Sequence, residues 1–267
     1  MSVIDAQFAK LRQEGKKAFM PFITAGDPDL QFTARIMREF AKHGCSFCEL
    51  GVPYSDPIAD GPVIQASYTR ALDKKTRVAD IMQMGSETNG SLDLPVVLMV
   101  SYAIIFRQGI ERFVERACQA GFAGAIVPDL PVEESGAISK LCRKSDFSLI
   151  QLVTPTTPRD RAIRIAEASS GFLYYVSVTG ITGERQELPP GIRNDISWIK
   201  QRTELPICVG FGISKPEHVK LLAPVADGLI VGSALVRIIA QAETRPAEEV
   251  IAEAMQLVDS LVEALPS

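Results

Sequence analysis

The sequence predicts one (β/α)8 barrel domain over residues 1–267, an α/β fold with an extra helix at its N-terminus. Three observations lead to this prediction. Short apolar runs alternate with amphipathic stretches, eight such runs occur along the chain, and no composition shift or linker marks a second domain. A doubly wound open sheet gives the same alternation. However, the first run lacks the Gly-x-Gly-x-x-Gly motif that follows it in the dinucleotide-binding form of that fold.

The N-terminal helix is predicted by the helical spacing of Ile4, Phe8 and Leu11, with Ser2 placed to cap it. The apolar runs that follow are the predicted strands, and the amphipathic stretches between them are the predicted helices. The strands are expected at residues 18–25, 46–51, 95–100, 124–127, 147–153, 171–177, 205–210 and 227–231. The helices are expected to reach residue 43, to cover 62–87 in segments and 110–120, to end at residues 143 and 168, and to cover 192–202, 233–241 and 247–264.

The composition is that of a soluble globular protein, with 46% hydrophobic and 22% charged residues. A net charge of −4 gives no basic surface for nucleic acid or for an anionic membrane. No apolar run approaches the roughly 18 residues that span a bilayer, and the N-terminus lacks the charged start and apolar block of a signal peptide. We therefore expect a soluble, cytoplasmic protein.

Glu49 is a carboxylate inside a short apolar run, where a charge is costly unless it is paired or used. Strand alternation groups Glu49 with Phe47 and Gly51 on one side, and Cys48 with Leu50 on the other. If the first side faces the barrel interior, Glu49 emerges at the end where barrel active sites lie. Its apolar surroundings should raise its pKa, which suits a group that gives and takes a proton near neutral pH. The alternative is a structural Glu paired with a buried Arg or Lys, yet no basic residue lies in the strand runs.

Asp60 follows in the loop after this strand, eleven residues beyond Glu49, and can reach the same end of the barrel. Two acids in different surroundings can hold different protonation states. The other role open to Asp60 is structural, because an Asp at this point can initiate a turn or cap the next helix. Asp56, in the same loop, is expected to be solvated or part of a contact surface.

The cysteines and histidines are not expected to carry chemistry. Cys45 and Cys48 have the spacing of a redox or zinc pair, but no second Cys-x-x-Cys or His-x-x-x-His motif completes a zinc site. We expect small buried apolar cysteines and no metal site. His43 and His218 fall on predicted helices away from the active end, which leaves the acids as proton carriers.

Glycines after the last two strands predict a phosphate site. Gly210 and Gly212 end the seventh strand, and Gly232 with Ser233 opens the helix after the eighth. Backbone amides at a helix N-terminus bind anions, and these two loops are the recurrent phosphate site of the barrel fold. The long loop 178–190 contains Gly183, which can supply another amide. This loop has the length and composition of a lid, although an ordinary surface loop is the alternative.

These residues resemble a known family, the α subunit of tryptophan synthase. The segment 49–62 alone is highly specific, and one difference lies after the third strand, where the family commonly reads Tyr-Asn-Pro and this chain continues from Tyr102 to Ala103 and Ile104. The motifs that carry the resemblance come in order over nearly the whole chain: Pro21-Phe-Ile-Thr-Ala-Gly-Asp-Pro28, Glu49-Leu-Gly-Val-Pro-Tyr-Ser-Asp-Pro-Ile-Ala-Asp-Gly-Pro62, Pro128-Asp-Leu-Pro-Val-Glu-Glu134, Thr154-Pro-Thr-Thr-Pro158, Val178-Thr-Gly-Ile-Thr-Gly183, Gly210-Phe-Gly-Ile-Ser214 and Gly232-Ser-Ala234.

The resemblance implies a lyase that splits indole-3-glycerol phosphate into indole and glyceraldehyde 3-phosphate by a retro-aldol reaction. It implies that Glu49 protonates C3 of the indole and takes the hydroxyl proton, while Asp60 accepts a hydrogen bond from the ring N–H. Thr182 is implied as the lid residue that reaches Asp60. The implied ring pocket is Phe22, Leu98, Tyr102, Leu130 and Tyr174, and the implied phosphate site is Gly183, Gly212, Gly232 and Ser233.

The resemblance also implies a partner, a PLP-dependent β subunit that receives indole through a tunnel in an α2β2 tetramer and makes L-tryptophan from it. The loops 53–60 and 178–190 border that interface in the family, and this chain itself is expected to hold no cofactor. Three alternatives remain open. They are a stand-alone lyase that releases free indole, another phosphate-binding barrel enzyme such as a sugar-phosphate isomerase, and a catalytically silent barrel that only binds or activates the partner.

Overall fold

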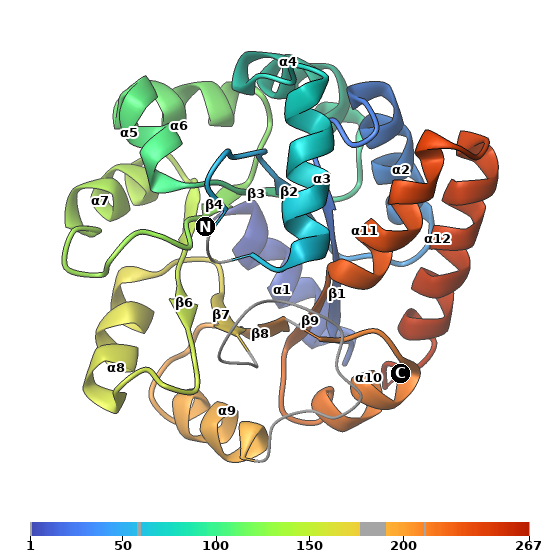
Figure 1. Cartoon of the computed structure of the whole chain (residues 1–267). Helices are drawn as coiled ribbons and strands as arrows, with labels where there is room; N and C mark the ends of the chain where they lie inside the picture. The colour runs from blue at the N-terminus through green and yellow to red at the C-terminus, as the bar shows by residue number, and fades with distance from the viewer. Residues whose placement is uncertain (1, 58–59, 177–190, 211, 267) are drawn as a thin grey trace.

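A computed structural model describes residues 2–57, 60–176, 191–210 and 212–266. Its strands form one parallel sheet that curls into a barrel, with helices around the outside (Figure 1). The predicted (β/α)8 barrel with an added N-terminal helix is therefore confirmed. The strands are β1 (Ala18–Thr24), β2 (Cys48–Gly51), β3 (Val96–Met99), β4 (Gly124–Ile126), β5 (Ser148–Ile150), β6 (Leu152–Val153), β7 (Leu173–Val176), β8 (Ile207–Gly210) and β9 (Gly228–Val231).

The two edge strands of the sheet, β5 and β6, are consecutive along the chain, and the barrel closes where they meet. The sheet order is β5-β4-β3-β2-β1-β9-β8-β7-β6, and β5 and β6 are two pieces of the strand predicted at 147–153, separated by Gln151. β5 pairs with β4, whereas β6 pairs with β7. The strand is divided because neighbouring strands tilt and stagger around a barrel, so one short strand changes partner along its length.

The helices cover the outer surface of the barrel (Figure 1). α5 and α10 lie outside the helices predicted from the sequence, and the predicted segment 62–87 is two helices, α3 and α4, with Lys75 at a φ of 62° between them. The helices are α1 (Val3–Gln13), α2 (Leu30–Lys42), α3 (Pro62–Asp73), α4 (Val78–Thr88), α5 (Tyr102–Gln108), α6 (Ile110–Gln119), α7 (Gly136–Lys144), α8 (Arg159–Ala168), α9 (Ile192–Lys200), α10 (Pro216–Leu222), α11 (Ser233–Ile239) and α12 (Ala247–Val262), with short 3-10 turns η1 (Asn89–Ser91) and η2 (Ala240–Glu243).

The N-terminal helix α1 packs against the inner core of the barrel. Ser2 caps it as predicted, because the Asp5 backbone N–H donates to the Ser2 hydroxyl oxygen over 3.2 Å and the Ser2 N–H donates to the Asp5 carboxylate over 3.0 Å. The ring of Phe8 then packs against Phe47 and Phe172, at centroid distances of 4.9 and 6.0 Å. These two aromatic residues immediately precede strands β2 and β7, so α1 covers the end of the barrel at which its strands begin.

Side chains along each strand alternate between an inner core and an outer core. Phe47 belongs to the inner core, which also holds strand residues from β1, β3, β7, β8 and β9. Cys48 and Leu50 belong to the outer core, which the strands share with helices such as α2 and α6. This is the alternation predicted around Glu49, whose side chain therefore points into the barrel.

Candidate active site

Glu49 lies in the middle of the parallel sheet, and its side chain is fully buried. Its register partners are Phe22 on β1 and Val97 on β3, and both belong to the inner core. Neither oxygen of its carboxylate has a hydrogen-bond partner among the residues that the structure describes. A structural Glu paired with a buried Arg or Lys is therefore not found in this part of the chain. A buried carboxyl group without a hydrogen-bond partner lowers the stability of the folded state, and its presence therefore indicates a functional role.

Burial dominates the electrostatics of the two acids. Desolvation, followed by repulsion from Asp60, raises the pKa of Glu49 to about 8. Desolvation also raises the pKa of Asp60 to about 6. At neutral pH, Glu49 is thus mainly a proton donor and Asp60 is mainly a carboxylate. The different protonation states expected of the two acids follow from these two pKa values.

The loop that carries Asp60 is held against the start of α3. The Asp60 backbone N–H donates to the Pro57 carbonyl over 3.1 Å, and the Gln65 side-chain amide donates to the Asp60 carbonyl over 2.7 Å. The N-cap of α3 is Gly61, and this position provides no side-chain cap hydrogen bond. Asp60 therefore does not serve as the helix cap, which was one of the two structural roles left open for it, the other being to initiate the turn.

One pocket brings the two acids together with aromatic residues and with two of the predicted phosphate-site residues, Gly232 and Ser233. Its lining is Phe22, Glu49, Asp60, Ile64, Met99, Tyr174, Ile230, Gly232 and Ser233. A neighbouring pocket shares Asp60 and Met99 and extends toward Ser101 and Asp129. Acid, ring and glycine groups thus meet at the end of the barrel opposite α1.

The structure places the predicted ring residues differently. Phe22 and Tyr174 line the pocket with Glu49. Leu98 and Leu130 instead belong to the outer core, and Tyr102 begins α5, where its backbone N–H donates to a carboxylate over 2.7 Å. Leu98 faces outward because it pairs in register with Leu50, which also faces outward.

Three apolar pocket residues escaped the sequence reasoning: Ile64, Met99 and Ile230. Met99 pairs in register with Gly51, which lies on the same side of β2 as Glu49. Counting alternation outward from Glu49 to its neighbouring strand would therefore have selected Met99 rather than Leu98.

The predicted phosphate residues are only partly gathered at the pocket. Gly232 is the N-cap of α11, Ser233 is the first residue of that helix, and both line the pocket. Gly212 has a φ of 85° and follows β8, but it is not part of the pocket lining. Gly183 and Thr182 lie outside the described residues.

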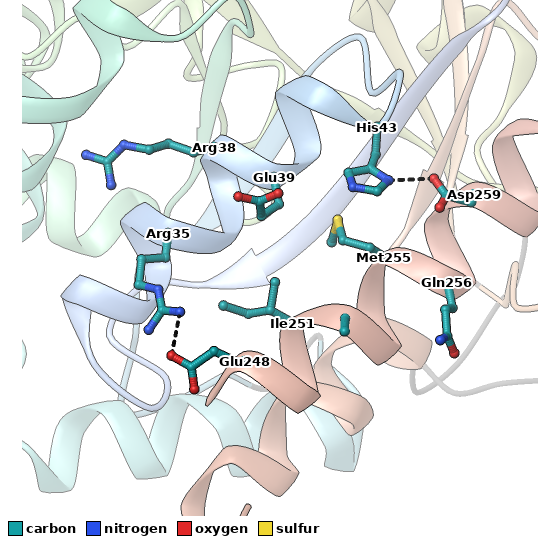
Figure 2. Close-up of a pocket in the computed structure, with 10 residues that line it drawn as sticks. Arg35, Arg38, Glu39, His43, Glu248, Ile251, Met255, Gln256 and Asp259 are labelled. Carbon is teal, nitrogen blue, oxygen red and sulfur yellow. Dashed lines mark hydrogen bonds and ion pairs between the residues drawn. The ribbon is translucent and has the colours of Figure 1, made fainter. Parts of the chain in front are cut away.

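None of the histidines and cysteines lines this pocket. The His43 imidazole is 2.7 Å from the Asp259 carboxylate, in a separate hollow between α2 and α12 that a salt bridge between Arg35 and Glu248 also spans (Figure 2). His218 is buried on α10. The five cysteines are free thiols. In the described part of the chain, no three His, Cys, Asp or Glu side chains are grouped so that they could hold a metal ion.

Gly51 provides a test of how tightly the pocket is packed. A methyl group at this position would lie 2.6 Å from the Phe22 ring and 3.0 Å from the Tyr68 hydroxyl. We expect Gly51→Ala to displace Phe22 and to lower the free energy of unfolding by about 2 kcal/mol, as overpacked cores do. Urea denaturation measures this loss. Gly90→Ala, where a methyl group meets nothing within 4 Å, is the control, and equal stability of the two variants would contradict the packing.

The raised pKa of Glu49 predicts how stability depends on pH. The unfolded chain releases the Glu49 proton near the ordinary pKa of 4.5, whereas the folded chain keeps it until about 8. This residue therefore lowers the free energy of unfolding as pH rises through that window, and the loss is complete above it. Glu49→Gln removes the effect. We expect the melting temperature of the variant, relative to the wild type, to rise between about pH 5 and about pH 8; a constant difference would contradict the shift.

The chain is similar to known proteins over most of its length. A family model described as "Tryptophan synthase alpha chain" matches residues 8–265. The chain is 57% identical over 245 residues to the tryptophan synthase alpha chain of Rhodopirellula baltica, covering 91% of this chain and 88% of that one. It is 46% identical over 238 residues to the corresponding chain of Arabidopsis thaliana, covering 89% and 86%.

A solved structure of the same family has the same fold as this chain. The structure superposes on the tryptophan synthase subunit alpha of Legionella pneumophila with a TM-score of 0.89 at 35% identity, covering 99% of this chain and 98% of that one. Among the described residues, no helix combines the length and apolar character needed to cross a bilayer. With a family model that spans nearly the whole chain and relatives well above 30% identity, this chain belongs to the tryptophan synthase alpha chain family.

Proposed function

We propose that Glu49 and Asp60 carry out the reaction of this family, the retro-aldol cleavage of indole-3-glycerol phosphate to indole and glyceraldehyde 3-phosphate. Family membership makes the chain a carbon–carbon lyase of tryptophan biosynthesis. The observation that supports the residue assignment is a buried, unpartnered Glu49 in one pocket with Asp60 and with Gly232 and Ser233. The pocket lining therefore includes both the two carboxylic acids and the N-terminus of α11.

Glu49 moves a proton twice in the proposed mechanism. The protonated acid first donates to C3 of the indole, because indole becomes a leaving group only after this tautomerisation. The resulting carboxylate then takes the proton of the side-chain hydroxyl. The O–H electron pair forms the aldehyde C=O, the C–C bond breaks, and its electron pair returns to the indole ring. Glu49 ends protonated again, and its pKa of about 8 suits both directions of transfer.

Asp60 stabilises the charged intermediate. Protonation of C3 places positive charge toward the ring N–H, and a carboxylate that accepts a hydrogen bond there lowers the energy of this state. Asp60 is suited to this role because its pKa of about 6 leaves it mainly ionised when Glu49 is still protonated. The two acids thereby take different parts in one reaction.

The remaining pocket residues hold the two ends of the substrate. Phe22 and Tyr174 contact the indole ring in this proposal, and Met99 lies beside them in the lining. The substrate phosphate binds the backbone amides at Gly232 and Ser233, where the start of α11 favours an anion. Gly212, Gly183 and the lid residue Thr182 complete the predicted site.

The partner proposed for this chain is a PLP-dependent β chain. The relatives are named as alpha chains, which supports the existence of a partner subunit. In this proposal the two chains form an α2β2 tetramer. Indole passes from the barrel to the β chain, where it is joined to serine. The barrel itself needs no cofactor for the two proton transfers, and its proposed location is the cytoplasm.

The test is turnover of indole-3-glycerol phosphate by the purified chain, followed as released indole and glyceraldehyde 3-phosphate. We expect equal amounts of the two products. A sugar-phosphate isomerase or a silent barrel would release no indole, and that result would overturn the proposal. Gel filtration and a rate measurement with added β chain then distinguish a stand-alone lyase, which neither binds that chain nor gains activity from it.

A further inference from the structure

Tyr68 on α3 is a buried tyrosine that the mechanism proposed above does not use. Its side chain is 3% exposed and belongs to the inner core of the barrel, together with Ile64 one helical turn earlier. It lines the pocket that shares Asp60 with the pocket around Glu49. Its hydroxyl lies 3.0 Å from the position that a methyl group on Gly51 would occupy, at the end of β2. The phenol is therefore at the same end of the barrel as the two acids.

Two contacts fix the part of α3 that carries Tyr68. The hydroxyl oxygens of Thr24 and Ser67 are 2.6 Å apart in the core. The Arg70 guanidinium donates to both carboxylate oxygens of the buried Asp27, over 2.8 and 2.7 Å. The two partners lie at the end of β1 and just after it, so α3 is bound to the barrel on either side of Tyr68. A side chain held in this way can meet a partner with little further loss of conformational freedom.

The Tyr68 hydroxyl is a donor that the described part of the chain does not use. Within residues 2–57, 60–176, 191–210 and 212–266 it has no hydrogen-bond partner, whereas a buried tyrosine hydroxyl usually has one. Burial, followed by the charges of Asp60 and Glu49, raises the pKa of Tyr68 well above its ordinary value. The phenol therefore keeps its proton near neutral pH and is available to donate it in a hydrogen bond.

Asp60 is the carboxylate that remains for this donor. In the lining of the pocket that holds Tyr68, Asp56 accepts a hydrogen bond from a serine hydroxyl over 3.0 Å. Asp129, in the same lining, accepts one from a serine hydroxyl over 2.6 Å and one from a backbone N–H over 2.7 Å. The Asp60 carboxylate has no such donor among the described residues. Glu49 is mainly protonated at neutral pH and carries its own proton.

We propose that Tyr68 is a positioning residue for Asp60: when substrate binds, its hydroxyl donates a hydrogen bond to the Asp60 carboxylate and orients it toward the indole N–H. This inference rests on the proposed function, which makes Asp60 the group that stabilises the charged ring. A carboxylate has about four acceptor sites, so Tyr68 leaves sites for the indole N–H and for Thr182. Catalytic hydrogen bonds are often long in a free enzyme and shorten in the complex with substrate. The donated bond also favours the ionised form of Asp60 in that complex.

The experiment measures kcat, KM and the pH profile of indole release for Tyr68→Phe, which keeps the ring and removes only the hydroxyl. We expect kcat to fall about tenfold, the contribution of one hydrogen bond to a charged group, with KM little changed. The acid limb of the kcat profile should move to higher pH, because Asp60 loses a hydrogen bond to its charged form. Urea denaturation checks that the variant is folded.

The matched control is Tyr175→Phe. Tyr175 is also buried, but in the outer core, and its hydroxyl donates to the Asp195 carboxylate on α9 over 3.0 Å. This variant also removes a tyrosine hydroxyl that faces a carboxylate, and it should keep the wild-type kcat and pH profile. An equal loss of kcat in the two variants would show that the effect of Tyr68→Phe does not depend on the pocket, and the positioning role would be wrong.

A double-mutant cycle with Asp60→Asn tests whether Tyr68 acts through Asp60. In that background Tyr68→Phe should lower kcat by about twofold or less, because the charged acceptor is already gone. A similar loss in both backgrounds, or an unchanged kcat or acid limb in Tyr68→Phe alone, would overturn the positioning role and leave the lyase proposal intact. A wild type that releases no indole would overturn the lyase proposal and this inference with it.

Discussion

The Glu49→Gln variant is expected to lose indole release by about a thousandfold or more, with its fold intact. Glutamine keeps the shape of the buried side chain but can neither donate a proton to C3 nor accept one from the hydroxyl. General acid or base catalysis contributes about 10²–10⁴ in rate, and the proposed mechanism uses Glu49 in both steps. The measurement is kcat for indole formation by the purified chain at a pH near neutrality.

The matched control for this substitution is Glu87→Gln, on the exposed surface of α4. This variant should keep the wild-type rate. Because the proposed mechanism places Glu49 in the chemical steps, its loss should lower kcat far more than it raises KM. A Glu49→Gln variant with more than about a tenth of the wild-type kcat would contradict its role in proton transfer, since the smallest contribution expected of such a group is about a hundredfold.

The Asp60→Asn variant is expected to reduce kcat by about a hundredfold. Asparagine can still accept a hydrogen bond from the indole N–H, but it lacks the negative charge that stabilises the protonated ring in the proposed mechanism. Removing one such electrostatic contact from an active site typically costs about 10²–10³ in kcat. The same assay of indole release by the chain alone measures the loss.

The control for Asp60 is Asp73→Asn, an exposed residue at the end of α3, the helix that follows the Asp60 loop. It removes one negative charge from the same region without touching the pocket, and it should leave kcat unchanged. An equal, small effect of both substitutions would show that Asp60 acts only through the overall charge. The hydrogen bond from the Gln65 side chain to the Asp60 backbone carbonyl does not involve the substituted side chain. It should therefore still hold the loop in place in Asp60→Asn.

The barrel and the position of Glu49 could be predicted from the sequence because both depend on local periodicity. Eight apolar runs separated by amphipathic helices specify parallel strands with crossovers. The period of two along β2 sends Cys48 and Leu50 to the outer core and Glu49 inward. Burial in an apolar run also predicted the direction of its pKa shift, which the structure bears out.

Features that depend on how neighbouring strands pair could not be predicted from the sequence of each apolar run taken separately. Leu98 was taken as a ring contact from the resemblance, but the register of β3 against β2 turns it outward and turns Met99 toward the pocket. The division of the fifth strand at Gln151 likewise follows from the curvature of the closed barrel. α5 and α10 were not predicted because a helix of 7 residues shows too few turns for a periodic signal.

Titration of the Glu49 carboxyl group tests the central claim most directly. In the chain labelled with ¹³C at the side-chain carboxyl of glutamate, the Glu49 resonance is identified by its loss in Glu49→Gln. Our account predicts a titration midpoint of about 8 in the folded, ligand-free chain. A midpoint near the ordinary value of 4.5 would contradict it, because Glu49 would then be ionised at neutral pH and could not supply the first proton.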